Sequence, residues 1–304
     1  MEKVILKTLI YADIFDYPLT IFEIHKWLIG RKATLRQVEK ALRKLNQESR
    51  QRQGSPKAAR IKNQGEYYFL STKDGLVAKR KQREKQSEKY LRKARILTQI
   101  LKLVPWIKLV GISGGLAMDN AGKSDDIDLF IITSNNRLWI SRFLAVGILD
   151  FMGVRRKVGI NGRKIAGKLC INTLLEEDRL GQRNKDIYLA HEVLQMKVLW
   201  QRDGVYSKYL LDNEWAFKFL PNWIAQEKVS NEGKVSNVSK VKTKKTFDTF
   251  RLGAFLEKIA KKFQLWYMQK PQGMERMEDG ALYFHPNDIR PKILKLYKQK
   301  TGTP

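Results

Sequence analysis

Residues 109–133 read LVGISGGLAMDNAGKSDDIDLFIIT, and this stretch decides the fold. Two apolar, β-branched runs, residues 107–112 and 126–132, predict two buried strands joined by a short connection. Successive strand residues point to opposite faces, so Asp126 and Asp128 project from the same face of the second strand. Neighbouring carboxylates repel each other unless a divalent cation lies between them, and oxygen ligands suit Mg²⁺ or Mn²⁺. The pair therefore predicts a metal site.

The connection between the strands begins with Ser113, Gly114 and Gly115. Glycines let the backbone turn tightly and leave amide N–H groups open to an anion. A short helix that begins at Leu116 would direct its N-terminal dipole at the same point. A phosphate site is therefore predicted next to the metal site.

A glycine turn followed, after residues 116–125, by Asp126-Ile127-Asp128 resembles the signature of the polymerase-β-type nucleotidyltransferase superfamily, and its small non-polymerase members in particular. The resemblance covers roughly residues 105–177. It implies a mixed β-sheet flanked by helices, and transfer of a nucleoside monophosphate from a nucleoside triphosphate (NTP) to an acceptor with the help of two divalent ions. Carried onto this chain, it places metal on Asp126 and Asp128, and triphosphate against Ser113, Gly114, Gly115 and Ser124.

The chain departs from the superfamily at the third carboxylate, which is expected on a later strand. The matching apolar strand is predicted over residues 168–175, and Asn172 stands at its centre. An amide oxygen can ligate a cation, but it brings no charge and cannot take the acceptor's proton. Asn172 is therefore the candidate third ligand, and Cys170, two residues away on the same face, reads as a small buried thiol.

Residues 1–75 predict three short helices followed by a β-hairpin over residues 61–70. Thr20 and Thr34 each precede a Glu or Gln by three residues, which indicates two capping boxes at helix starts. The order resembles a winged helix-turn-helix domain, in which the third helix enters the major groove of DNA. By that resemblance the reading face consists of Arg36, Gln37, Lys40, Arg43 and Lys44. The alternative is a solvated helix face on a module that docks on protein.

The net charge of +28 is concentrated near the N-terminus, where residues 1–104 hold 25 Lys and Arg against 10 Asp and Glu. Such a surplus attracts polyanions, because neutralised phosphates release their counterions. DNA or RNA is therefore an expected partner beside the NTP. An anionic membrane surface is the weaker candidate.

The remaining segments complete an expected α+β architecture. Residues 76–104 predict a basic connecting helix, residues 105–183 the nucleotidyltransferase-like domain, and residues 184–304 a helical C-terminal subdomain. Within the last, residues 228–246 predict a flexible basic segment. A single cysteine and the absence of a long uncharged apolar run indicate a cytoplasmic protein without a transmembrane segment.

These features predict a nucleotidyltransferase that uses Mg²⁺ or Mn²⁺, with RNA, protein or a small molecule as acceptor. A different function stays open, that of a winged-helix regulator whose degenerate nucleotidyltransferase-like domain senses a nucleotide without transferring it. A third hypothesis is an adaptor that docks its basic surface on ribosomal or membrane anions. The sequence leaves the acceptor, the preferred base and the oligomeric state open.

Overall fold

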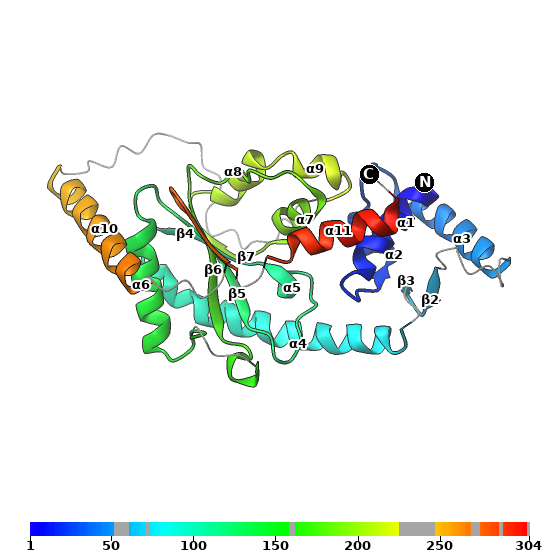
Figure 1. The fold of residues 1–304 in the computed structure, drawn as a ribbon, viewed down its shortest axis with the longest axis horizontal. Helices are drawn as coiled ribbons and strands as arrows, with labels where there is room; N and C mark the ends of the chain where they lie inside the picture. The colour runs from blue at the N-terminus through cyan, green and yellow to red at the C-terminus, as the bar shows by residue number, and fades with distance from the viewer. Residues whose placement is uncertain are drawn as a thin grey trace.

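The two strands predicted around the glycine turn form the centre of a six-stranded sheet (Figure 1). β4 (Ile107–Ile112) and β5 (Ile127–Thr133) pair antiparallel, and β6 (Leu169–Glu176) joins β5 in parallel. β7 (Lys197–Gln201), β8 (Met274–Glu278) and β9 (Ala281–His285) complete the order β7-β4-β5-β6-β9-β8. The computed structural model describes residues 1–51, 61–70, 73–157, 162–224, 247–268, 274–285 and 288–302. The α+β class with a mixed sheet is confirmed.

The C-terminal part of the chain is not the helical subdomain that was predicted. β7 pairs with β4, and the β9–β8 hairpin pairs with β6, so residues 184–304 supply three of the six strands. The helix that begins at Ile187 ends at Gln195, and the residues after it extend along β4. A five-residue edge strand is too short for its alternation to outweigh helical spacing. The predicted flexible segment, 228–246, lies outside the described residues.

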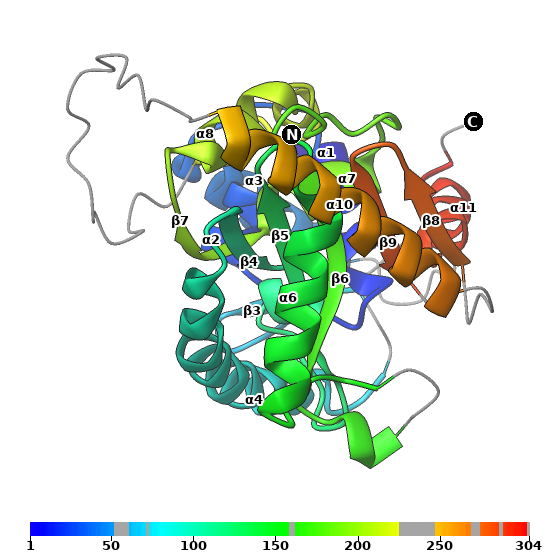
Figure 2. The same ribbon diagram turned by 90° about the vertical axis from the view of Figure 1, so that its left-hand side faces the viewer.

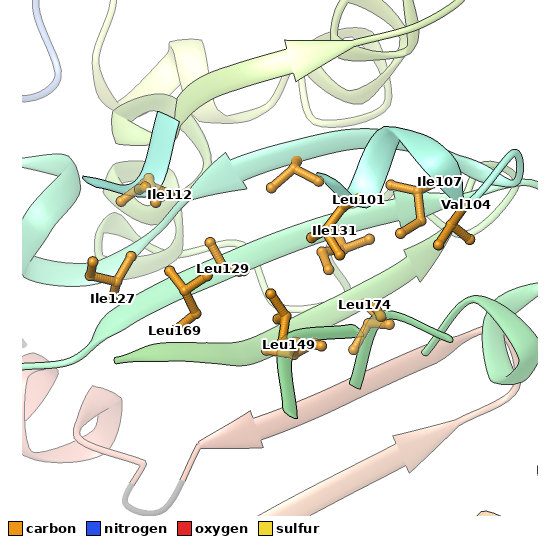
Figure 3. Packing of buried hydrophobic residues seen from close by; sticks show 14 of the residues in the cluster. Leu101, Val104, Ile107, Ile112, Ile127, Leu129, Ile131, Leu149, Leu169 and Leu174 are labelled. Atoms are coloured by element: carbon orange, nitrogen blue, oxygen red, sulfur yellow. The ribbon is translucent and has the colours of Figure 1, made fainter. Parts of the chain in front are cut away.

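Helices cover both faces of the sheet (Figures 1 and 2). One face lies under α4 (Leu76–Leu97), the 3-10 helix η1 (Thr98–Leu103), α6 (Leu138–Phe151) and α10 (Phe247–Tyr267). Figure 3 shows Ile127, Leu129 and Ile131 of β5 in this core. The other face receives Phe130 and Ile132 and lies under α7 (Ile187–Gln195), α8 (Val205–Asp212), α9 (Ala216–Phe219) and α11 (Arg290–Thr301). A second 3-10 helix, η2 (Gly162–Ile165), precedes β6. The alternation along β5 therefore sends Asp128 to the α7 face.

The N-terminal module consists of three helices and a small antiparallel sheet in the order β1-β3-β2. Its elements are α1 (Glu2–Asp13), β1 (Leu19–Thr20), α2 (Ile21–Lys26), α3 (Leu35–Gln51), β2 (Lys62–Gln64) and β3 (Tyr67–Phe69). Both capping boxes are confirmed: Glu23 N–H donates to Thr20 Oγ1 at 3.3 Å, and Gln37 N–H donates to Thr34 Oγ1 at 3.3 Å. β1 was not predicted, because its two residues read only as a helix start. α2 ends at Lys26, one residue before Trp27.

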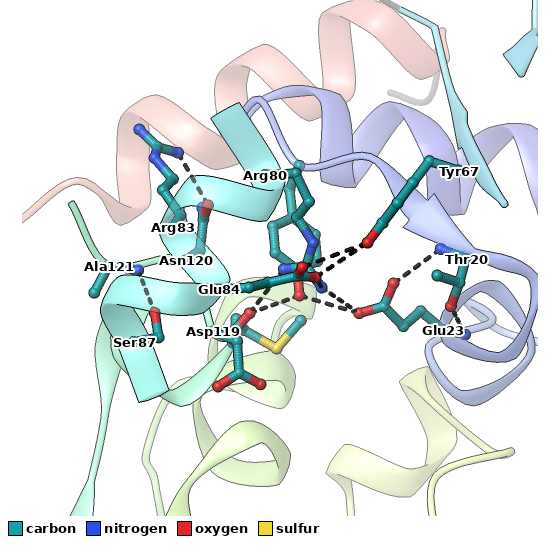
Figure 4. A network of polar contacts seen from close by, with 12 residues as sticks. Thr20, Glu23, Tyr67, Arg80, Arg83, Glu84, Ser87, Asp119, Asn120 and Ala121 are labelled. Carbon is teal, nitrogen blue, oxygen red and sulfur yellow. Dashed lines mark hydrogen bonds and ion pairs between the residues drawn. The ribbon is translucent and has the colours of Figure 1, made fainter. Parts of the chain in front are cut away.

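Arg80 of α4 fastens this module to the sheet domain (Figure 4). Its side chain is only 4% exposed, and its guanidinium contacts Glu23 Oε1 at 2.7 Å and Glu84 Oε1 at 2.9 Å. The same group donates to the carbonyl of Met118 at 3.2 Å and lies over the Tyr17 ring. The Tyr17 hydroxyl also donates to the Met118 carbonyl, at 2.6 Å. Met118 directly follows the glycine bend, so the N-terminal module is held against that part of the molecule.

None of the helices in the described part of the chain is long and apolar enough to cross a membrane.

Candidate functional site

The glycine bend follows β4 and touches the acid pair. Ser113 N–H donates to the carbonyl of Asp128 at 3.1 Å, which fixes the bend beside the start of β5. Gly114 has a φ of +65°, and a Cβ atom built on it would lie 3.2 Å from Asp128 Oδ2. Only glycine satisfies both the left-handed backbone and this close approach without strain. The bend and the acid pair therefore converge.

The short helix after the bend, α5 (Gly114–Ala117), begins two residues earlier than predicted and contains only four residues. The peptide dipoles of only four residues add up to a weak helix dipole. The bend would therefore attract an anion mainly through its amide N–H groups. Ser113 is buried, and within the described ranges its hydroxyl has no hydrogen-bond partner. Ser124 is exposed on the loop before β5, where its hydroxyl makes no hydrogen bond to the bend or the acid pair within those ranges.

The acid pair has Cys170 as its neighbour on β6, not Asn172. β5 and β6 place Cys170 opposite Asp128, and one ligand atom each from Asp126, Asp128 and Cys170 lie within 4.8 Å of one another. Two carboxylates and a thiol form a donor set that fits a divalent cation, with the carboxylates suited to Mg²⁺ or Mn²⁺ and the thiolate to softer ions.

A β-bulge lies at Asn172 on β6. Leu129 pairs with Ile171 and Phe130 pairs with Thr173, so Asn172 is an extra residue on β6. Ile171 and Leu174, three residues apart, consequently face the same core under α6. Asn172 is 6% exposed, and its Oδ1 finds no hydrogen-bond partner among the residues that the structure describes. Cys170 joins the acid pair as a residue that the sequence reading had not placed at the metal, and the assignment of Asn172 as the third ligand stays a prediction.

Arg156 provides the positive charge at the acid pair. Its Nη1 atom lies 2.7 Å from Asp126 Oδ2, and both side chains are largely buried. Burial and the charge of Asp126 together raise the pKa of Asp128 to about 8, although Arg156 lowers it. Burial and the two carboxylates also raise the pKa of the Cys170 thiol, to about 12. One guanidinium thus only partly offsets two carboxylates, and a bound cation would stabilise both in their charged form.

Two residues at this site were missed from the sequence. Arg156 belongs to the basic run Arg155-Arg156-Lys157 after α6, where nothing distinguishes it from its neighbours. Glu192 lies on α7, and burial raises the pKa of its carboxyl to about 7, although a hydrogen bond from the Gly114 amide, which places the carboxylate beside the bend, lowers it. Asp125, directly before the pair, turns to a different partner, because its Oδ2 accepts the Gly122 N–H at 2.8 Å.

The basic face predicted on the third helix is exposed on α3. Val38, Ala41, Leu42 and Leu45 fill the opposite, buried face, which leaves the polar side chains in solvent. Gln37 uses its side-chain oxygen to accept the Thr34 N–H, and Lys44 pairs with Glu2 at 2.8 Å. The exposed row consists of Arg36, Gln37, Lys40, Arg43 and Lys44.

No protein-family model matches this chain, and no curated protein matches it. Its function is therefore inferred from the geometry of the bend, the acid pair and the surfaces around them.

Proposed function

We propose that the chain is a nucleotidyltransferase that moves a nucleoside monophosphate from an NTP to an acceptor hydroxyl. The main support is the convergence of the glycine bend with Asp126 and Asp128, because NTP chemistry needs a backbone cradle and a metal site side by side. The resemblance of residues 105–177 to polymerase-β-type nucleotidyltransferases agrees with an antiparallel pair followed by a parallel strand.

Each part of the site has a role in this proposal. Asp126 and Asp128 would hold Mg²⁺ or Mn²⁺, which would neutralise charge on the phosphates and lower the pKa of the acceptor hydroxyl. The amides of the bend would orient the triphosphate. A bond forms between the acceptor oxygen and the α-phosphorus, the bond to the β-phosphate oxygen breaks, the hydroxyl proton is lost and pyrophosphate leaves. Cys170 stands where a third carboxylate would assist, so we expect a slow enzyme.

The proposal extends to the N-terminal module, residues 1–75, as a winged helix that contacts nucleic acid. Three helices, a hairpin and a short strand paired with it support this assignment, as does the exposed basic row on α3. A nucleic-acid acceptor or template would then be brought to the catalytic sheet by the same chain.

A second candidate function is nucleotide sensing by a DNA-binding regulator. The ion pair between Arg156 and Asp126 and the neutral Cys170 favour it, because both reduce the charge available for metal. Such a protein would bind NTP at the bend and change its affinity for DNA without releasing pyrophosphate.

Incubation with each α-labelled NTP, Mg²⁺ or Mn²⁺, and total RNA, DNA, protein or small-molecule extract tests the proposal. We expect label transfer that falls at least about a hundredfold in Asp126→Asn and in Asp128→Asn, since loss of a metal ligand removes transition-state stabilisation of about 3 kcal/mol or more. Asp125→Asn is the matched control, because that carboxylate turns to Gly122. Transfer that survives both substitutions contradicts the proposal, and NTP binding that needs both aspartates without any transfer supports the sensor.

A further inference from the structure

A cavity of about 260 Å³ lies where the N-terminal module meets the central sheet. Its wall combines Tyr11 and Trp27 of the module with Gly114 and Gly115 of the bend and with residues of α7. Gly114 also approaches Asp128 Oδ2, so one residue borders both the cavity and the acid pair. If one part of a molecule binds in the cavity, the chemical group attached to that part would therefore reach the glycine bend.

Flat rings make up much of this wall. Tyr11 stacks on His191 with ring centroids 4.2 Å apart and planes 9° apart. Trp27 lies with its centroid 5.3 Å from that of His191, and Tyr188 adds a further ring to the lining. Aromatic walls of this kind favour a planar aromatic ligand, which can stack without losing hydrogen bonds from its edges.

Two polar groups in the wall supply hydrogen-bonding capacity. His191 is 6% exposed, and its Nε2 atom has no hydrogen-bond partner within the part of the chain that the structure describes. Burial lowers the pKa of His191 to about 3, so the imidazole is neutral. Glu192 offers carboxylate oxygens that accept from the Gln195 amide at 2.5 Å and keep further lone pairs. An unpartnered ring nitrogen and an acceptor-rich carboxylate suit a ligand whose edge carries N–H donors and a ring nitrogen or carbonyl.

We infer that this cavity binds the nucleobase of the substrate nucleotide, stacked on the aromatic wall with an N–H edge toward Glu192. The inference rests on the proposed function, since the triphosphate of such a nucleotide would continue past Gly114 to the bend and the acid pair. Nucleobases combine a flat π-face with N–H donors, as this wall requires. Guanine presents two adjacent N–H donors to a carboxylate and is expected to bind best. The N-terminal module then forms part of the substrate site.

Saturation-transfer NMR with adenosine, guanosine, cytidine and uridine, each at millimolar concentration in EDTA, tests the inference without phosphates or metal. We expect guanosine to bind most tightly and to lose about tenfold or more in affinity in Trp27→Leu, because one stacked aromatic surface is removed. Glu192→Gln, which keeps the shape but replaces an acceptor by a donor, is expected to weaken guanosine more than uridine. Trp266→Leu, which removes an exposed tryptophan of α10, is the matched control.

Tyr188→Leu repeats the test from α7 if Trp27→Leu does not fold by circular dichroism. The absence of binding by every nucleoside overturns the inference, as does binding that persists unchanged in both variants or a clear preference for a base other than guanine. The nucleoside-binding assay and the label-transfer assay can fail independently of each other. Label transfer that is lost in Asp126→Asn, combined with no nucleoside binding, supports the nucleotidyltransferase and contradicts the nucleobase site in the cavity. Nucleoside binding that is lost in Trp27→Leu, combined with no label transfer, supports the nucleobase site and contradicts the nucleotidyltransferase.

Discussion

Asp126 has two competing cationic partners, the Arg156 guanidinium that it contacts at 2.7 Å and any divalent ion held together with Asp128. A divalent cation carries two charges and the guanidinium one. The cation replaces the guanidinium at Asp126 when it also binds the carboxylate of Asp128. In the proposed metal site, the arginine would therefore raise the concentration of free metal at which Asp126 and Asp128 bind the ion.

Arg156→Gln is expected to raise the affinity for Mn²⁺ several-fold, because the competing charge disappears while both carboxylates remain. Electron paramagnetic resonance of free Mn²⁺ measures the affinity directly, without nucleotide. Arg155→Gln is the matched control, since the Arg155 guanidinium pairs with Asp150 instead of with the acid pair. Equal affinities in wild type and Arg156→Gln would show that the arginine does not compete with metal.

Glu192 should make folding stability depend on pH. Burial raises the pKa of its carboxyl from 4.5 to about 7, although the Gly114 amide and Gln195 lower it. The folded state then binds the proton more tightly than the unfolded chain, so its contribution to stability falls as pH rises from about 4.5 to about 7. Glu192→Gln removes this decline, which amounts to at most about 3 kcal/mol.

Urea unfolding at about pH 5 and about pH 7.5 checks the sign. Between these values wild type should lose more free energy of unfolding than Glu192→Gln does. The exposed Glu214→Gln serves as control and should follow wild type. Parallel losses in wild type and Glu192→Gln would contradict the raised pKa.

At the scale of single elements, α3 carries a prediction about nucleic acid. Lys40→Ala combined with Arg43→Ala should weaken duplex DNA binding across all sequences and lower the salt slope by about 2, because two phosphate contacts are lost. Binding measured by fluorescence anisotropy over a series of salt concentrations gives that slope. Lys261→Ala combined with Lys262→Ala removes the same charge from the exposed face of α10 and should change the slope little. Equal effects of the two pairs would assign binding to net charge alone.

Local signals in the sequence were sufficient to predict the helix ends and turns that depend on residues only a few positions apart. The capping boxes at Thr20 and Thr34, the hairpin and the two strands around the glycine bend all depend on neighbours in the chain. The period of two on β5 correctly placed Asp126 and Asp128 together. Such features need no knowledge of the tertiary structure.

Features set by distant neighbours could not be read in the same way. β7 is a strand because β4 offers it an edge, and the Asn172 bulge depends on how β6 meets β5. Cys170 comes before the bulge and lies opposite Asp128 through the register of β5 and β6, whereas the inserted Asn172 shifts the side chains that follow it by one face. Arg156 and Glu192 reach the site only through the fold, and neither carries a local signature.

On the scale of the whole molecule, a buried guanidinium, that of Arg80, lies where the N-terminal module meets the sheet domain. Arg80→Ala leaves the carboxylates of Glu23 and Glu84 without their cation and removes the contact to Met118. We expect a loss of about 3–5 kcal/mol in the free energy of unfolding, because breaking a buried ion pair strands the remaining charge.

Chemical denaturation monitored by circular dichroism measures this loss. Arg92→Ala on the same helix breaks only an exposed pair with Glu88, and should cost no more than about 0.5 kcal/mol. A similar small cost for Arg80→Ala would mean that the other contacts between the two parts are sufficient to hold them together.

The strand order also bears on how the polypeptide acquires its structure on the ribosome. β4, β5 and β6 are translated early, but the free edge of β6 is paired only once β9 has emerged, more than a hundred residues of synthesis after β6 begins. Until then an apolar strand presents unpaired amides and carbonyls, a template for association with other nascent chains. α11, later still, supplies Tyr297 against Tyr11, beside the cavity. Translation that stalls before these segments would thus yield a polypeptide in need of a chaperone, with its ligand pocket still unfinished.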